Sequence, residues 1–236
     1  MSAPGPGEWE RERRCAPAAV LHGPWPPEDR RRRRIVAQCA VTDEAVVLGS
    51  TQRPEVLDPR RLEEAGVHAV RRGSGGGAVL VAPGAQVWVD LWLPRPDPLW
   101  DDDVIAASAW VGRAWGRALE ELGVPGALVH TGRADGAGWA GVLCFAGLGP
   151  GEVTVGGAKV VGVAQRRTRH GARLSTMALR RWEPGTLGAL LARPPSDDEL
   201  EALGTLAVGL DDLRPSGSGA GIDDDAVLDA VVRALP

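Results

Sequence analysis

The stretch Arg71-Arg72-Gly73-Ser74-Gly75-Gly76-Gly77-Ala78-Val79 decides which fold the sequence can adopt. An apolar run, Val67–Val70, precedes it, and from Val87 to Leu93 apolar residues alternate with Trp88, Asp90 and Trp92. Alternation with a period of two predicts half-buried strands on both sides of the glycines. No helix opens after the glycines and no Gly-Lys-Ser/Thr follows them, which excludes a Rossmann fingerprint and a Walker A loop.

The residues of this loop suit an anionic ligand. Consecutive glycines allow positive φ and let bare backbone N–H groups approach a ligand closely. Two arginines and a serine beside them are suited to hydrogen bonds with a phosphate or a carboxylate. The alternative is a flexible hairpin turn with no ligand.

Lys159 is the only lysine in the chain, and all other side chains of similar basicity are arginines. It follows a glycine turn, Gly156-Gly157, and enters an apolar strand that continues to Gln165. An ammonium group is a compact point charge, whereas guanidinium is a wide planar fork. A narrow pocket that touches one carbonyl or phosphate oxygen therefore favours lysine. The alternative is an exposed turn lysine with no role.

These stretches together resemble the lipoate–protein ligase A family, in the superfamily of biotin/lipoate ligases and octanoyltransferases. The family motif Arg-Arg-x-Ser-Gly-Gly-Gly-Ala-Val is matched from Arg71 to Val79, and Gly-x-Lys-Val/Ile-x-Gly-x-Ala-Gln from Gly157 to Gln165. A Gly-x-x-Gln turn is matched by Gly49–Gln52. The resemblance spans about residues 45–179, and the first two motifs are specific in combination.

The resemblance implies the roles of individual residues. ATP and then the acyl-adenylate would be held by Arg71, Gly76, Gly77, Ala78, Val79 and Lys159. Lys159 would be the catalytic residue, in contact with the acyl carbonyl and the phosphate. The substrates would be ATP with Mg²⁺ and lipoate or octanoate. The acceptor would be a lysine of a lipoyl domain, either in the E2 subunit of a 2-oxoacid dehydrogenase or in the glycine cleavage H protein.

Two features keep other readings open. Leu80-Val81-Ala82-Pro83 stands where family ligases continue toward a His-Asp pair. Cys144, followed by Phe145, lies fifteen positions before Lys159, with Glu152 between them. Cysteine-dependent octanoyltransferases of the superfamily use such a cysteine as acyl nucleophile, so Cys144 is a candidate nucleophile or a buried strand residue. Glu152 is a candidate Mg²⁺ ligand or an orienting partner of Lys159.

Three hypotheses of function follow. The leading one is an ATP-dependent lipoate–protein ligase. The second is an octanoyltransferase that takes the acyl group from an acyl carrier through Cys144. The third, from a different class, is a non-catalytic relative that binds an acyl ligand or a lipoylated partner, because the His-Asp pair is missing. His170, which precedes Gly171, is interpreted as a strand-end residue.

Composition bounds the remaining possibilities. With 236 residues and 44% hydrophobic content the chain can bury a core, and its net charge of −4 argues against a nucleic-acid or anionic-membrane partner. No apolar run reaches spanning length, and the three cysteines are widely spaced, which favours a cytoplasmic protein with free thiols. We predict a Pro/Arg-rich N-terminal segment (1–34), a catalytic domain (35–193) and a helical extension (194–236).

The order of elements predicts an α+β fold with a mostly antiparallel sheet and helices packed on it. Helices are predicted at Asp58–Ala65 and Asp103–Leu122, and two more after Ser196 and at Asp223–Leu235, separated by a linker at 215–219. Further strands are predicted at 35–41, 45–48, 128–130, 141–145, 152–155, 159–167 and 172–179.

Overall fold

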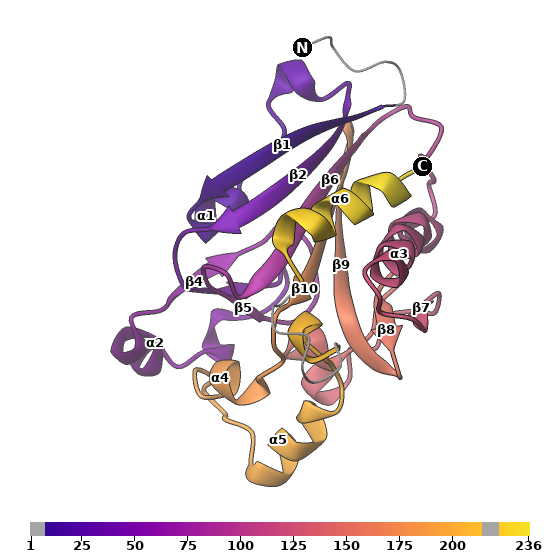
Figure 1. The fold of residues 1–236 in the computed structure, drawn as a ribbon. Coiled ribbons are helices and arrows are strands. Elements are labelled where there is room, and N and C mark those ends of the chain that lie inside the picture. The colour runs from indigo at the N-terminus through magenta and orange to yellow at the C-terminus, as the bar shows by residue number, and fades with distance from the viewer. Residues whose placement is uncertain (1–7, 214–221) are drawn as a thin grey trace.

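The α+β architecture is confirmed by the structure, a computed structural model that describes residues 8–213 and 222–236 (Figure 1). The predicted linker at 215–219 lies outside the described residues. The strands are β1 (Trp9–Ala16), β2 (Arg34–Val41), β3 (Ala45–Leu48), β4 (His68–Arg71), β5 (Val79–Val81), β6 (Gln86–Pro94), β7 (Ala127–Val129), β8 (Val153–Val155), β9 (Ala158–Thr168) and β10 (Gly171–Leu179).

The strands form a large and a small sheet. The large sheet has the order β1-β2-β6-β10-β9-β8-β7, and the small one the order β4-β3-β5. Neighbours in the large sheet are antiparallel except β1 and β2. In the small sheet β3 pairs with β4 in parallel and with β5 antiparallel. The predicted antiparallel character is therefore confirmed for most of the large sheet.

Strand β6 differs from the half-buried strand that its alternation predicts. All nine of its residues are buried. Val87, Val89, Leu91 and Leu93 pack in one core cluster, whereas Trp88 and Trp92 pack in a second cluster on the opposite face. The alternation thus separates two buried faces of a central strand, because tryptophan supplies apolar surface where a half-exposed strand would carry polar side chains.

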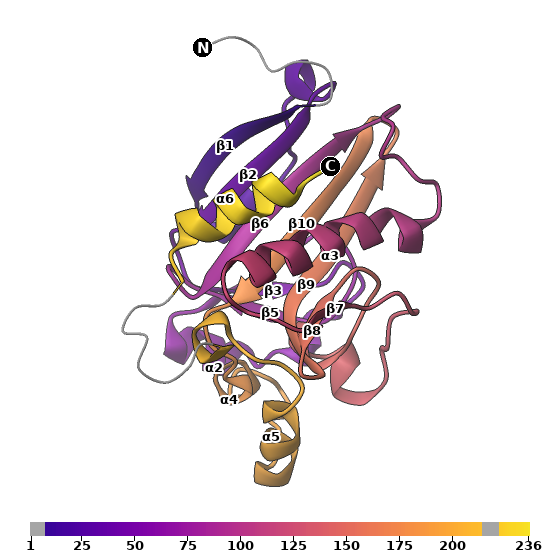
Figure 2. The same cartoon turned by 45° about the vertical axis from the view of Figure 1, so that its right-hand side comes forward.

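Helices α3 (Val104–Glu121) and α6 (Asp224–Ala234) cover the first of these faces (Figure 2). Both begin at a predicted position, since the side chains of Asp103 and Asp223 accept hydrogen bonds from backbone N–H groups of the first turn. Their apolar sides join one core cluster with β6. The C-terminal helix therefore packs on the sheet, as predicted.

The small sheet and helix α1 (Ala18–Leu21) cover the opposite face of the large sheet. Ala45 and Val47 of β3 and Val79 of β5 share a core cluster with the two tryptophans of β6. The glycine loop between β4 and β5 is thereby placed beside the large sheet.

Shorter helices gather beyond the small sheet (Figure 1). They are α2 (Pro59–Ala65), α4 (Pro184–Gly188) and α5 (Asp197–Gly204). Asp58 caps α2 and Gly66 ends it in the left-handed conformation, while Ser196 and Glu199 form a capping box at the start of α5. These boundaries confirm the predicted ones. Among the described residues, no helix combines the length and apolarity needed to cross a membrane.

The N-terminal segment contains a strand that its composition does not predict. β1 pairs along its whole length with β2 at the edge of the large sheet. Glu10 and Glu12 of this strand form ion pairs with Arg30, and Glu10 also pairs with Arg33 at 3.3 Å. Part of the arginine run thus faces acidic groups of the same chain. The division into three parts at residues 34 and 193 stays a prediction.

The strand predicted at 141–145 is wrong. The chain instead forms two 3₁₀ turns, η3 (Gly138–Gly141) and η4 (Cys144–Ala146), with one bridge between Ala78 and Leu143. The reason is that the carbonyl groups of Cys144 and Gly147 turn toward the Lys159 ammonium. Groups used in this way are not available to a strand ladder.

A buried polar cluster lies under α1. Asp90 of β6 is completely buried and pairs with Arg173 of β10, while Trp88 Nε1 donates to its Oδ1 at 2.9 Å. Burial by itself raises the pKa of Asp90. Arg173 and several hydrogen bonds outweigh that effect, so the pKa of Asp90 ends below its ordinary value of 3.8. The ion pair therefore persists throughout the neutral and mildly acidic range.

His22 stacks on Trp88 next to this cluster, with 4.5 Å between the ring centroids. Its pKa is lowered from 6.5 to about 4, first by burial and then by Arg173, Arg72 and Arg14, while Asp90 opposes the shift. The folded state therefore holds a neutral imidazole at pH values where the unfolded chain binds a proton.

We predict that the free energy of unfolding falls by about 2 kcal/mol between pH 6.5 and pH 4.5, because protonation of His22 stabilises only the unfolded chain. Below pH 4 the folded protein also binds this proton and the contribution levels off. His22→Phe keeps a ring on Trp88 and removes the titration. Urea unfolding of both proteins across this range measures the difference. The prediction fails if the two proteins lose stability in parallel.

Candidate functional site

Arg72 is the internal support of the glycine loop. It is 6% exposed, and its Nη2 donates to the carbonyl oxygens of Gly75 at 2.9 Å and Gly77 at 2.8 Å. Its Nη1 reaches the carbonyl oxygen of Val47 in β3 at 3.3 Å. One guanidinium thus ties the loop to the small sheet. From the sequence, both arginines are candidates for contact with an anion and Arg71 is assigned to ATP. The supporting role of Arg72 inside the loop is not predicted, although burial beside carbonyl groups suits the multiple donors of arginine.

Arg71 has a different position. Its exposed side chain donates through Nη1 to the carbonyl oxygens of Gly49 at 2.9 Å and Gln52 at 2.6 Å. It therefore fastens the Gly49–Gln52 turn to the end of β4, and its guanidinium lies at the surface beside the loop.

The glycine loop and the Gly49–Gln52 turn touch backbone to backbone. A Cβ atom at Gly49 would lie 2.0 Å from the carbonyl oxygen of Gly76, so only glycine fits there. Ser50 N donates to Ser74 O at 2.9 Å across the same contact. The motif Arg71–Val79 and the turn Gly49–Gln52 are therefore in contact, and this contact requires glycine at position 49.

Gly77 allows a second close approach. A Cβ atom there would lie 2.5 Å from the carbonyl carbon of Leu143. Two hydrogen bonds cross this contact, from Ala78 N to Val142 O at 2.7 Å and from Cys144 N to Ala78 O at 2.8 Å. The loop that precedes Lys159 in the sequence is therefore held directly against the glycine loop.

The backbone of the glycine loop keeps its donors free. None of the N–H groups of residues 73–77 donates a hydrogen bond to an acceptor within the described part of the chain. Gly73, Gly75 and Gly76 are exposed, and Gly76 has a φ of 97°. Consecutive free N–H groups in a turn form a concavity that binds anions. An arrangement of this kind can accept a phosphate or a carboxylate group.

Lys159, at the start of β9, is 1% exposed. Its Nζ donates to the carbonyl oxygens of Cys144 at 2.7 Å and Gly147 at 3.0 Å, and forms an ion pair with Glu152 Oε2 at 2.7 Å. An ammonium group has three N–H donors, so each has a protein acceptor. The predicted charge is present next to the site, but it is directed at the loop that flanks the glycines.

Glu152 holds Lys159 in place. Besides the ion pair, its oxygens accept hydrogen bonds from Gly149 N at 2.7 Å and Val163 N at 3.2 Å. It is 5% exposed. Of the two roles weighed for Glu152, this geometry favours orienting Lys159. No group of three or more His, Cys, Asp or Glu side chains in residues 8–213 and 222–236 could hold a metal ion.

Cys144 lies in the turn η4, where its half-buried side chain packs against the core cluster between the two sheets. Its backbone joins the glycine loop and Lys159, as described above. His170 lies at the far end of β9, in the turn before β10, so it is separated from Lys159 by the length of that strand.

One cavity borders the end of the glycine loop. Its volume is about 310 Å³, and most of its lining is apolar. Ala78, Val79 and Phe145 are among its lining residues, and the Lys159 Nζ lies 5.0 Å from the centre of the Phe145 ring. Of the predicted site residues, Ala78 and Val79 thus line an apolar space close to the buried charge.

The chain matches a known protein family and shares its fold with several solved structures. The family model of the lipoyl protein ligase A/B catalytic domain matches residues 29–212. No curated protein matches the sequence.

Several solved structures are similar to the chain. A lipoate–protein ligase A bound with ATP is 18% identical, with 96% of this chain and 83% of that chain covered and a TM-score of 0.69. A bipartite lipoate protein ligase from Thermoplasma acidophilum, reported with its E2 lipoyl domain, is 15% identical over 96% and 82%, with a TM-score of 0.67. A lipoate protein ligase structure from T. acidophilum with bound lipoic acid is 17% identical over 98% and 84%, with a TM-score of 0.63. Identities this low show the shared fold.

We predict that Lys159→Met destabilises the protein by about 3–5 kcal/mol, because Glu152 then stays buried without its counter-charge. Adding Glu152→Gln should recover part of this loss, since the remaining amide is neutral. Urea unfolding of the single and double variants measures both effects. A double variant no more stable than Lys159→Met would show that the ion pair is not the source of the loss.

Proposed function

This chain belongs to the lipoyl protein ligase A/B catalytic-domain family, and from this premise we propose that it is an ATP-dependent lipoate–protein ligase. The substrates would be ATP and lipoate or octanoate, and the acceptor a lysine of a lipoyl carrier domain. The observation that carries the proposal is the glycine loop, whose N–H groups at residues 73–77 are free of acceptors within the described chain.

The reaction would proceed in two steps. A carboxylate oxygen of the acid attacks the α-phosphorus of ATP. The bond between this phosphorus and the oxygen that bridges it to the β-phosphate breaks, and pyrophosphate leaves. The amine of the carrier lysine then attacks the acyl carbon, AMP leaves with the bond electrons, and the amine loses a proton. The chain would contribute positioning and preorganised donors rather than a covalent group.

The chain's own residues divide this work by position. The free N–H groups of the glycine loop would hold the phosphate, with Arg72 keeping the loop in shape and Arg71 at the surface beside it. The cavity lined by Ala78, Val79 and Phe145 could take apolar atoms of the acid. Lys159 lies next to Phe145, and its positive charge would favour the negative charge that develops on the acyl oxygen.

A binding place for magnesium is not supplied by a cluster of three or more ligating side chains in the described part of the chain. Both oxygens of Glu152 already accept hydrogen bonds from N–H groups, and the described residues hold no cluster of metal ligands. We therefore assign no step to a protein-bound Mg²⁺, although the ion can accompany ATP.

The carrier is proposed from the neighbours. One similar structure is described with its E2 lipoyl domain, and others with ATP or with lipoic acid. Lipoyl domains of E2 subunits are therefore the first acceptors to test, with the glycine cleavage H protein as the second.

We predict that the purified protein transfers lipoate to a lipoyl domain only with ATP, and that Cys144→Ser keeps this activity within about threefold of the parent. An adenylate route needs no protein thiol. The mass of the carrier domain measures transfer. A parallel reaction without ATP supplies the octanoyl group on an acyl carrier. Transfer in that reaction, with an octanoyl thioester on Cys144, would instead establish the transferase. Absence of transfer in both reactions would favour the non-catalytic relative.

A matched pair of glycines tests the loop. At Gly76 the φ of 97° disfavours any side chain, and a Cβ atom would lie 2.9 Å from the Arg72 Nη2. At Gly75 a Cβ atom would meet nothing within 4 Å. We predict that Gly76→Ala weakens ATP binding by about tenfold or more, because the N–H groups lose their common direction.

Gly75→Ala is the control, and it should bind ATP within about twofold of the parent. Isothermal titration calorimetry with ATP gives both affinities, and thermal melting shows that the variants are folded. Equal affinities for the two variants would contradict the role of the loop in nucleotide binding.

A further inference from the structure

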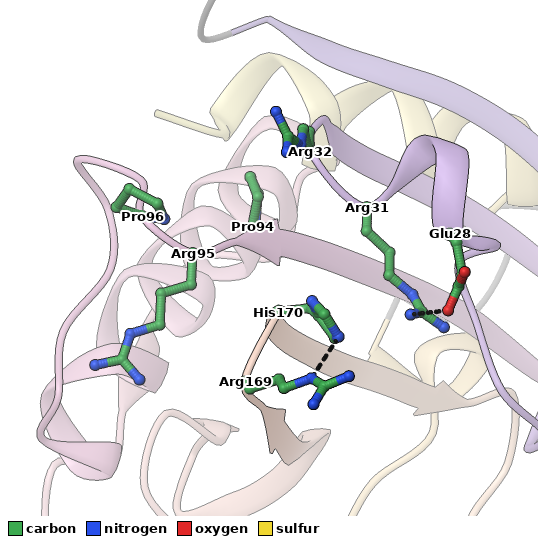
Figure 3. A pocket seen from close by; sticks show the side chains of 8 residues that line it. All are labelled: Glu28, Arg31, Arg32, Pro94, Arg95, Pro96, Arg169 and His170. Carbon is green, nitrogen blue, oxygen red and sulfur yellow. Dashed lines mark hydrogen bonds and ion pairs between the residues drawn. The ribbon is translucent and has the colours of Figure 1, made fainter.

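A larger cavity lies at the end of β9 that is opposite to Lys159. Its volume is about 780 Å³ (Figure 3). Three segments form it: the turn before β2, the end of β6 and the turn between β9 and β10. The lining residues are Glu28, Arg31, Arg32, Pro94, Arg95, Pro96, Arg169 and His170. None of them was assigned a role from the sequence motifs.

The charge of this cavity is strongly positive. Four arginines line it, against one carboxylate, Glu28, which pairs with Arg31 at 3.1 Å. Arg95 pairs with Asp102 at 3.4 Å outside the lining. Arg32 and Arg169 form no ion pair within the described residues. Two of the four arginines are thus paired with acidic side chains and two are not, which leaves an excess of positive charge that attracts an anion.

His170 extends the set of donors. Its Nε2 accepts a hydrogen bond from Arg169 Nε at 2.9 Å. A neutral imidazole that accepts at Nε2 carries its proton on Nδ1, so it can donate there. Figure 3 shows Arg169, His170 and Arg31 close together, from two different segments.

A second, smaller cavity lies next to the first one and is lined by Arg166, whose side chain reaches the glycine loop. It has a volume of about 160 Å³ and shares Arg31 and His170 with the first cavity. Arg173 also lines it, is 8% exposed, and its Nε donates to no acceptor within the described residues. At the other side lies Arg166, whose Cδ and Nη1 are 2.7 Å from the place of a Cβ atom on Gly73. Cationic side chains therefore continue from the loop to the large cavity.

We propose that the cavity lined by Arg31, Arg32, Arg95, Arg169 and His170 binds the di- or triphosphate group of a phosphorylated ligand. Guanidinium groups pair with phosphate oxygens through two parallel hydrogen bonds, and several such groups around one cavity match a chain of phosphates. The concave shape between three segments favours a small ligand over a flat protein surface.

This phosphate group can come from two sources. It is the tail of a nucleotide held at the glycine loop, in which case this step rests on the proposed function, or it belongs to a separate ligand. The chemistry at the cavity is the same in both cases. Competition between nucleotides and inorganic tripolyphosphate separates them, and failure of acyl transfer would leave the binding test intact.

The experiment uses the full chain and inorganic tripolyphosphate, with binding measured by isothermal titration calorimetry. The double variant Arg32→Gln with Arg169→Gln removes the two arginines without acidic partners. A control with the same change of net charge is Arg60→Gln with Arg113→Gln, two exposed arginines on α2 and α3. We expect about tenfold weaker binding in the first variant and less than twofold change in the control. Thermal melting shows that both variants are folded.

Competition then identifies the source. Loss of tripolyphosphate binding in the presence of ATP, but not of AMP, supports the nucleotide tail, and unchanged binding at saturating ATP supports a separate ligand. Either result keeps the site. Absence of tripolyphosphate binding to the parent protein would overturn the proposal, and so would equal weakening in the two double variants.

Discussion

The buried charge of Lys159 is the interaction on which the rest of the site depends. The ammonium group lies 1% exposed among two carbonyl oxygens and the Glu152 carboxylate. A charge taken out of water is tolerated only when its donors find acceptors. The turn around Cys144 therefore adopts a 3₁₀ conformation that points carbonyl groups inward. Through the hydrogen bond from Cys144 N to Ala78 O, the same segment determines where the glycine loop can lie.

Close backbone contacts then fix the position of the glycine loop. Gly49 and Gly77 let neighbouring backbones approach to distances that a Cβ atom would prevent. The buried guanidinium of Arg72 donates hydrogen bonds to the carbonyl oxygens of Gly75 and Gly77. The carbonyl groups of Gly75 and Gly77 are used on the inside, whereas Gly73, Gly75 and Gly76 are exposed and their N–H groups donate to no acceptor within the described residues. The loop is thus rigid where it is held and open where an anion would bind.

The sequence predicts features that depend on neighbouring residues better than features that depend on contacts between distant segments. Asp58, Asp103 and Ser196 mark helix starts through chemistry within one turn, so those boundaries are confirmed. The core face of β6 follows from its alternation, but whether its other face is exposed depends on what packs there. The prediction of a strand at 141–145 is wrong because it also depends on a distant residue: the Lys159 ammonium group binds carbonyl groups in and beside this segment. Motif resemblance brought Arg71, the glycines and Lys159 together, yet only the fold distinguishes the surface arginine from Arg72.

The full coordination of Lys159 limits how it can act on a substrate. Its three donors already have acceptors, so a hydrogen bond to an acyl or phosphate oxygen requires the exchange of one of them. Breaking the pair with Glu152 would leave a buried carboxylate, at a cost of about 3–5 kcal/mol. Releasing a carbonyl oxygen of Cys144 or Gly147 costs about 1–3 kcal/mol. Exchange at a carbonyl is therefore favoured, and it would loosen the same turn that supports Ala78. Binding of a substrate oxygen by Lys159 and movement of this turn are thus expected to occur together, while Glu152 keeps its partner.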